Sequence, residues 1–246
     1  MQRLTSARWI AAGLALLAAM VLFMAGAGTK VGLWDFRTGL GMLKWAAYLG
    51  VAAAVASLAL LAVLRPHGRV LGLLLVSTIV GLAVIALPWQ WRRIARAAPP
   101  IHDITTDLGN PPAFEAILPL RADAPNPAEY GGPEVAAQQR AAYPEIAPVF
   151  VDASPGTAFQ RSLDAARGMG WEIVTADSAR GRIEAVATTR WFGFKDDVVI
   201  RVAQDGSRAR IDVRSVSRVG GSDVGTNARR IRDFIERVHA AAPAES

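Results

Sequence analysis

The sequence predicts an α+β protein in which a three-helix transmembrane anchor precedes a two-layer α/β sandwich. Two observations lead to this fold class: three long uncharged apolar runs in the first hundred residues, and four alternating polar and apolar segments flanked by amphipathic helices near the end. The length of 246 residues allows one or two domains. We divide the chain into an anchor (1–97), a proline-rich extended arm (98–149) and a soluble α+β domain (150–246).

The apolar runs cover residues 9–27, 45–64 and 70–87, and none contains an acidic, basic or histidine side chain. A membrane-spanning helix needs roughly 20 apolar residues, whereas a soluble helix shows a polar face at every turn. The first run follows a basic segment, as a signal peptide would, but its length and the two later runs favour a retained helix. Transporters usually carry ionisable groups inside their spans, so we interpret the bundle as an anchor whose partner is the lipid bilayer.

The sequence also indicates how the helices of this anchor pack and how the anchor is oriented in the membrane. Small residues at 50, 54, 72 and 81 are predicted to pack the helices together. A plain count of flanking basic residues favours a cytoplasmic C-terminal domain, whereas the basic segment before the first helix favours an N-terminus that stays inside. With three spans, the second argument places the C-terminal domain outside.

The charge of the chain is divided unevenly between its two parts. Ten of the 27 Lys and Arg residues but one of the 21 acids lie before residue 98, so the high pI of about 10.4 belongs to the anchor. There the basic residues flank apolar runs, as they do at membrane surfaces, and we predict no nucleic-acid partner. The absence of cysteine excludes disulfides, thiolate catalysis and cysteine zinc sites. Phosphate-loop and dinucleotide motifs are also missing, so no cofactor is predicted.

Prolines are frequent in residues 98–148, and such a segment is not expected to form a helix or a central strand. This stretch is too apolar and too long for a solvated linker, which favours an arm packed along the soluble domain over a disordered tether. Beyond it, Ser154 and Pro155 predict a helix start and Gly168 its end. Four alternating strands follow near 171–175, 182–187, 198–202 and 208–214, and then a helix with one apolar face. The polar face of the sheet, with Arg208, Arg210, Asp212 and Arg214, is expected to stay in water.

Several motifs resemble a bacterial family catalogued as domain of unknown function 1499. They are DITTD (103–107), NPPAF (110–114), YPEIAP (143–148), MGWEIV (169–174), WFGFKDDVVIRV (191–202) and DVRSVSRVGGSDVGTNARRIRDF (212–234). The resemblance covers roughly the last sixty per cent of the chain. Some relatives consist of this domain behind an export or lipid-attachment signal, which implies a periplasmic domain and a cell inner membrane anchor. The family implies no activity.

The segment WFGFKDD (191–197) connects two predicted strands and has three interpretations. In the first, its aromatic rings form a lip over an apolar ligand and its charged residues orient a polar group. In the second, the rings enter the headgroup layer of the membrane. In the third, the segment is a hairpin connection whose rings cover the core and whose acids are solvated.

A second candidate site is RSVSRVGGSD (214–223), where a strand end, a glycine turn and a helix start follow one another. Two arginines beside a helix N-terminus suit an anion, although the same residues also suit a helix cap and surface ion pairs. The predicted binding surface joins both segments. Its residues are Trp191, Phe192, Phe194, Lys195, Asp196, Asp197, Arg214, Ser217, Arg218, Ser222, Asp223 and Asn227.

We therefore predict an integral membrane protein that presents a non-catalytic ligand- or protein-binding domain at the membrane surface. Its partner would be an unknown envelope protein or a small ligand, and no catalytic residue or metal is predicted. The alternative is a carboxylate-dependent hydrolase of the cell envelope, with or without a divalent metal ion. Asp103 and Asp107 form the alternative acidic cluster, together with Asp196 or Asp223. Carboxylates that converge within about 5–10 Å would favour this alternative.

Overall fold

The computed structural model describes residues 2–241, with side chains from Ser6 onward. Two compact units divide these residues. The first contains the chain up to Ile94 together with residues 190–193, and the second contains the remainder. Each unit is described on its own below.

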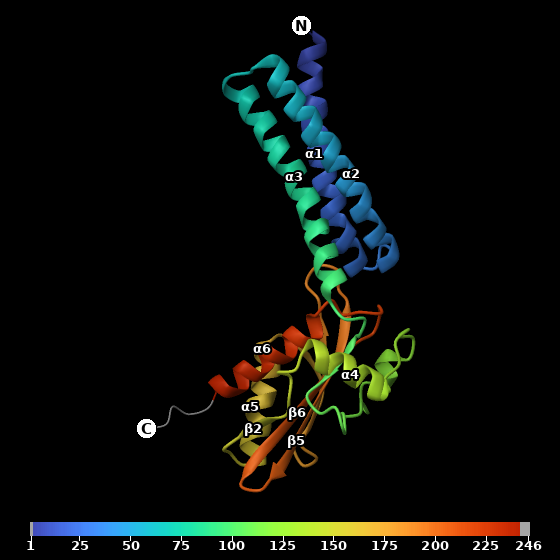
Figure 1. The fold of residues 1–246 in the computed structure, drawn as a ribbon, viewed down its shortest axis with the longest axis vertical. Helices are drawn as coiled ribbons and strands as arrows, with labels where there is room; N and C mark the ends of the chain where they lie inside the picture. The colour runs from blue at the N-terminus through green and yellow to red at the C-terminus, as the bar shows by residue number, and fades with distance from the viewer. Residues whose placement is uncertain (1, 242–246) are drawn as a thin grey trace. The chain divides into compact units, whose positions relative to one another are not determined.

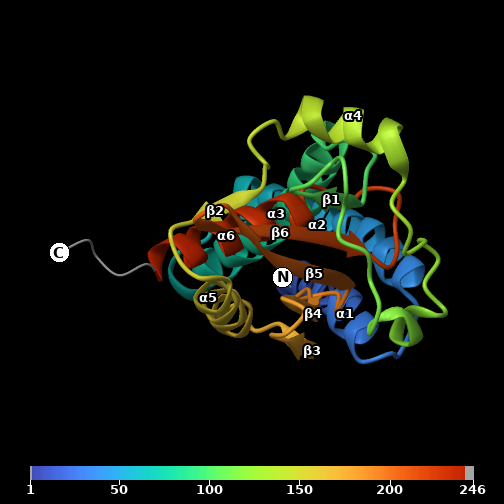
Figure 2. The ribbon, with the colours of Figure 1, turned by 90° about the horizontal axis from the view of Figure 1, so that it is seen from below.

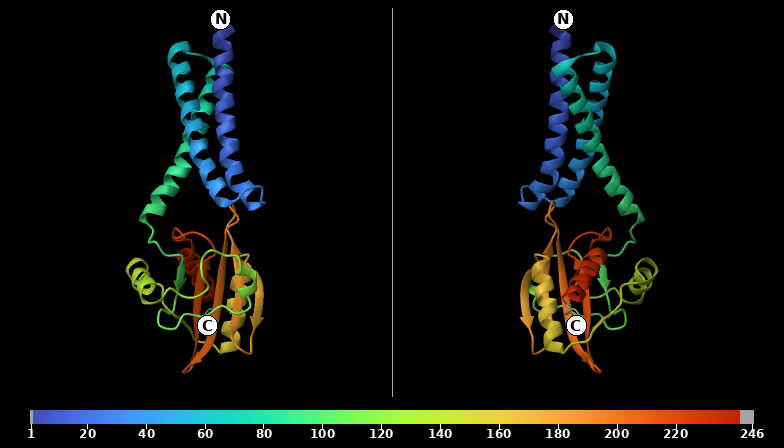
Figure 3. Two further views of the ribbon diagram at one scale, coloured as in Figure 1. Left: turned by 90° about the vertical axis from the view of Figure 1, so that its right-hand side faces the viewer. Right: turned by 90° about the vertical axis from the view of Figure 1, so that its left-hand side faces the viewer.

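Three long helices form the first unit and run alongside one another (Figures 1 and 3). They are α1 (Gln2–Lys30), α2 (Phe36–Leu64) and α3 (Gly68–Ala97), and all three are long and apolar enough to cross a membrane. This confirms the three predicted apolar helices. The helices extend beyond the apolar runs. For example, α2 begins nine residues before Trp45, because the Asp35 side chain caps it by accepting hydrogen bonds from the backbone N–H groups of Arg37 and Thr38.

Glycines allow α2 and α3 to approach each other closely. A Cβ atom on Gly81 would lie 2.7 Å from the carbonyl oxygen of Gly50, and one on Gly50 would lie 2.8 Å from the carbonyl oxygen of Gly81. Ala54 completes this contact. Gly72, predicted from the sequence to belong to the same packing surface, has open space around it. The small-residue contact is therefore confirmed in the middle of α3 and is wrong near its start.

A six-stranded antiparallel sheet forms the centre of the second unit, where four strands were predicted. Its strands are β1 (Asp103–Thr105), β2 (Val149–Val151), β3 (Glu172–Asp177), β4 (Arg182–Thr188), β5 (Lys195–Asp205) and β6 (Arg208–Ser217). The order is β1-β6-β5-β4-β3, and β2 also pairs with β6. Of the two additional strands, β1 lies in the proline-rich segment and β2 directly follows it, and both pair with the outer edge of β6. Between β1 and β2, the Thr106 N–H donates to the carbonyl oxygen of Val213, and the Val213 N–H donates to the Thr106 hydroxyl. The outer edge of β6 is therefore hydrogen-bonded to β1, Thr106 and β2 in turn.

Helices α5 (Pro155–Gly168) and α6 (Thr226–Ala240) cover one face of the sheet (Figure 2). The Ser154 hydroxyl accepts a hydrogen bond from the Thr157 N–H, which confirms the predicted helix start. The core between these layers includes Ile183, Ile200 and Ile211. Trp171 stacks on Phe234 there, with a centroid distance of 5.6 Å. The predicted helix–sheet sandwich is confirmed.

The opposite face of the sheet is covered as well, which corrects the expectation that it stays in water. The segment between β1 and α4 (Gly132–Ala142), which includes the 3₁₀ helix η1 (Leu118–Arg121), crosses this face (Figure 2). Phe114 and Ile117 pack there against Val186, Val199 and Val216. Asp212 and Arg214 are consequently 1% and 2% exposed. The alternating charged residues of β6 therefore face a covered surface, where they form ion pairs.

Candidate functional site

The structure separates the aromatic residues of the predicted loop. Residues 190–193, which connect β4 to β5, belong to the unit that contains the three apolar helices. There the Trp191 indole N–H donates to the carbonyl oxygen of Phe23 at 3.2 Å, and the Trp191 ring lies 5.0 Å from that of Trp91. Phe192 is buried beside both rings. Phe194 lies in the second unit. Its backbone N–H donates to the Thr189 hydroxyl, and its carbonyl oxygen accepts from the Thr189 N–H.

The charged part of the loop begins β5, with Lys195 exposed and the next two residues buried. Asp197 accepts three hydrogen bonds from the Arg218 guanidinium, at 2.7–3.1 Å. Arg121 Nη1 adds an ion pair to Asp197 at 3.3 Å, outside hydrogen-bond geometry. Burial lowers the pKa of Arg121, although the charge of Asp197 opposes that shift. This site therefore pairs one buried carboxylate with two arginines.

Asp196 belongs to a second buried network, which fixes the N-terminal turn of α6. Arg230 donates to Asp196 at 2.5 Å and also to Ser215 and Asn227. The Asn227 amide group in turn donates to Ser217 and to the carbonyl oxygen of His102.

Asp223 caps the same helix by accepting from the N–H groups of Gly225 and Asn227. Burial raises the pKa of Asp223, and these hydrogen bonds oppose the rise. Ser222 is tied down by a hydrogen bond to the carbonyl oxygen of Pro99. The turn therefore satisfies its own polar groups.

Asp103 and Arg214 form a buried bidentate pair across 111 positions of sequence, with bonds of 2.9 and 2.7 Å. Arg214 also lies 5.0 Å from the ring centre of Phe114 and 5.5 Å from that of Tyr130. Burial raises the pKa of Asp103, and the Arg214 guanidinium opposes the rise. Burial also raises the pKa of Tyr130, to about 12.

Asp107 does not lie with Asp103 in an acidic cluster. It shares two arginines, Arg201 and Arg210, with Asp212 in a four-membered ion network. The pKa of Asp107 lies below its usual value. Burial by itself would raise this pKa, but backbone hydrogen bonds and the two arginines outweigh the effect of burial.

These contacts decide how the acidic residues can act. The four acids predicted to serve a hydrolase are all engaged by arginine or by backbone N–H groups. Within the described residues, no three or more His, Asp or Glu side chains gather as metal ligands. Strong electrostatic stabilisation of buried carboxylates suits a structural role, because a general base needs a lone pair that faces the substrate.

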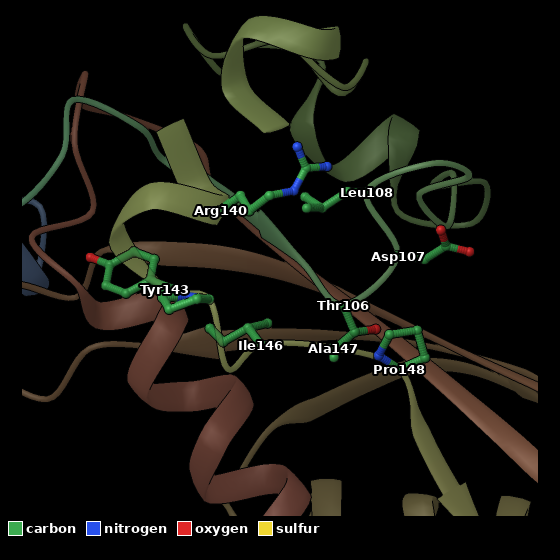
Figure 4. Close-up of a pocket in the computed structure, with 9 residues that line it drawn as sticks. Thr106, Asp107, Leu108, Arg140, Tyr143, Ile146, Ala147 and Pro148 are labelled. Carbon is green, nitrogen blue, oxygen red and sulfur yellow. The ribbon is translucent and has the colours of Figure 1, made fainter. Parts of the chain in front are cut away.

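The second unit is hollowed elsewhere, on both sides of Arg140. One hollow, of about 350 Å³, is bordered by residues 106–108, Arg140 and the segment from Tyr143 to Pro148 (Figure 4). Another, of about 430 Å³, is bordered by residues 108–111, Tyr130 and the first part of α4. Leu108 and Arg140 border both hollows, and we call the combined feature the Arg140 groove.

Two hydrogen-bonding systems, one exposed and one buried, hold the walls of the Arg140 groove. On one side, Asp107 accepts from the N–H groups of Gly109 and Asn110, which fixes the turn that carries Leu108. On the other side, the fully buried Gln139 amide bonds both the N–H and the carbonyl of Thr105, at 3.0 and 2.6 Å. Gln139 thereby fastens α4 to the edge strand β1, and the next residue, Arg140, is held at the groove. Figure 4 shows the Arg140 side chain extending beside Leu108.

The groove combines apolar walls with one available cation. Four prolines and two tyrosines border it: Pro111, Pro133, Pro144, Pro148, Tyr130 and Tyr143. Arg140 is exposed and forms no ion pair with any described residue. Such a surface suits an extended chain segment with an acidic group, because aromatic and proline surfaces pack flat apolar residues while a guanidinium binds a carboxylate. This groove was not predicted from the sequence, although Arg140 and the YPEIAP motif (143–148) border it.

Comparison with protein families identifies the second unit. The model of a family described as a protein of unknown function (DUF1499) matches residues 103–238. The chain belongs to this family. The match begins at Asp103 and ends at Val238, so it contains the sheet, α5, most of α6 and the Arg140 groove. No curated protein matches the chain.

Proposed function

We propose that this DUF1499 protein is a non-catalytic binding protein of the cell envelope, whose Arg140 groove holds an extended segment of a partner protein. The observation that carries the proposal is the groove itself, with apolar walls and one unpaired cation on a rigid frame. Its two hollows are open to the surface and adjoin along Leu108 and Arg140. This shape favours an extended chain over a small molecule, which usually occupies a more enclosed cavity.

A binding role is supported over hydrolysis by the state of the carboxylates. In the second unit the acids that a hydrolase would use hold strands and helix ends together. The groove offers Asp107 as its nearest acid, and that group is already bonded to two arginines.

We further propose a multi-pass location in the cell inner membrane with a periplasmic second unit. The basic residues at the N-terminal end of α1 support an internal N-terminus, and three helices then carry the chain to the other side. A reporter fused after Ser246 tests this orientation by its accessibility to a membrane-impermeant reagent. A reporter that is protected in intact cells would contradict the periplasmic assignment.

Site-specific photo-crosslinking in intact membranes tests the groove. A photoreactive amino acid at Pro133 or Pro144, both exposed at the groove, is expected to give a defined protein adduct. Arg140→Glu should reduce this adduct at least tenfold, because it reverses the charge that binds the acidic group. The same amino acid at Gln160, exposed on α5, is the control and should give no adduct.

A photoreactive amino acid at Lys195 tests the surface that the sequence predicts around residues 191–197. An adduct from Lys195 alone would favour that surface and contradict binding at the Arg140 groove. Groove adducts that persist unchanged in Arg140→Glu would contradict the proposed role of the cation.

A further inference from the structure

The end of α3 presents two arginines and a tryptophan on one face of the helix. Trp89, Arg92 and Arg93 have the spacing i, i+3 and i+4, which places their side chains together. All three are exposed, and Trp89 retains 59% of its surface. Arg93 lies over the Trp89 ring, 5.0 Å from its centre. We call this feature the Trp89 stripe.

The neighbouring groups of the first unit leave the Trp89 stripe free. Trp91 lies about 200° around the helix from Trp89 and packs against Trp191 and Phe192. The single acid of the first unit, Asp35, is engaged as the cap of α2 and bonds Thr38. Neither Arg92 nor Arg93 forms an ion pair with any described residue.

The position of the stripe indicates what it meets. It directly follows the apolar run of α3, where a helix that crosses a bilayer reaches the headgroup layer. An indole ring at this level prefers the boundary between acyl chains and headgroups, and a guanidinium binds a phosphate through two parallel hydrogen bonds. We propose that the Trp89 stripe binds the phosphate groups of anionic phospholipids, and so selects these lipids around α3. The apolar surface that adjoins it favours a lipid over a free phosphate.

Lipid titration of the full-length protein in detergent, followed by native mass spectrometry, tests the proposal. The probes are phosphatidylglycerol and phosphatidylcholine with the same acyl chains. Each basic residue near an anionic surface contributes about a fivefold preference, so Arg92→Gln/Arg93→Gln should weaken phosphatidylglycerol binding about 25-fold. Phosphatidylcholine binding should stay unchanged.

A matched variant removes the same charge from the other end of the helices. Arg65→Asn/Arg69→Gln changes two exposed arginines, one just after α2 and one in the first turn of α3. Asparagine is chosen at position 65 because Arg65 has a left-handed backbone (φ 43°). This variant should keep phosphatidylglycerol binding. Equal losses in both variants would show that net charge alone attracts the lipid and would overturn the site.

Two further experiments test whether the paired hydrogen bonds of arginine matter and whether the site prefers a lipid to free phosphate. Arg92→Lys/Arg93→Lys keeps the charge but removes the paired hydrogen bonds, so binding between that of the wild type and the glutamine variant is expected. Displacement of the lipid by millimolar inorganic phosphate would show that the arginines bind any phosphate, and would overturn the lipid assignment. Helical circular dichroism should remain unchanged, because the substituted side chains are exposed.

Discussion

Replacing Asp103 with asparagine removes one charge from a deeply buried ion pair of the second unit. The side chains of Arg214 and Asp103 are 2% and 6% exposed, so neither charge is stabilised by water. Asparagine retains one acceptor but leaves the Arg214 charge without its counter-ion. Breaking such a pair costs about 3–5 kcal/mol, and we expect the free energy of opening of β6 to fall by that amount.

Hydrogen–deuterium exchange of the full-length protein in detergent measures this change strand by strand. Every 1.4 kcal/mol corresponds to a tenfold change, so the amides of β6 should exchange about 100- to 4000-fold faster in Asp103→Asn. Glu145→Gln is the control, because the Glu145–Arg232 pair is exposed (51% and 40%) and should contribute no more than about 1 kcal/mol.

A second variant separates the buried charge from the loss of packing. Asp103→Leu/Arg214→Met removes both charges and should lose only about 1–3 kcal/mol, because the carbonyl oxygens of Pro112 and Ala128 then lack their donor. If Asp103→Asn destabilised β6 no more than Glu145→Gln did, or if the double variant lost more than the single one, the argument from buried charge would be refuted.

Three further predictions concern helix packing, the covered sheet face and pH. Gly81→Val should destabilise the helical unit by about 1–3 kcal/mol in thermal unfolding, because its side chain meets backbone, whereas Gly72→Val meets open space and should stay within about 1 kcal/mol; equal effects would contradict this contact. Glu184→Gln should speed amide exchange at residues 115–117 while α6 stays protected, because the N–H groups of Glu115 and Ile117 bond the Glu184 carboxylate; unchanged exchange would contradict that role. Since burial raises the pKa of Tyr130, the stability it contributes is complete below pH 10 and is lost as pH rises towards 12. Tyr130→Phe should remove a tyrosinate absorbance step near pH 12, and a step that persists in this variant would contradict the assignment.

Strong local patterns of the second unit were predictable from the sequence. Ser154 followed by proline indicated the start of α5, because a serine hydroxyl satisfies a free N–H of the first helical turn. The face of α6 with Ile231, Phe234 and Val238 followed from helical spacing, and all three are buried. Strands β1 and β2 were missed because each has only three residues, too few for an alternating pattern.

The candidate sites show a different limit. Asp197 and Arg218 were selected as ligand-binding residues because charges at a strand end suit an anion, yet they bond each other in the structure. Sequence spacing does not show which charge meets which partner. The Arg140 groove was missed for the same reason, since its two walls come from segments about 30 residues apart.

The sequence by itself determined that the chain has three helices long and apolar enough to cross a membrane, and an antiparallel sheet with covering helices. These features depend on hydrophobic periodicity and on caps, which act between residues a few positions apart. Only the tertiary structure decided that the proline-rich segment covers the second face of the sheet, that the acids are paired, and that Arg140 stays free. Pairing and burial depend on contacts between residues as far as 111 positions apart, and local sequence patterns do not predict such contacts.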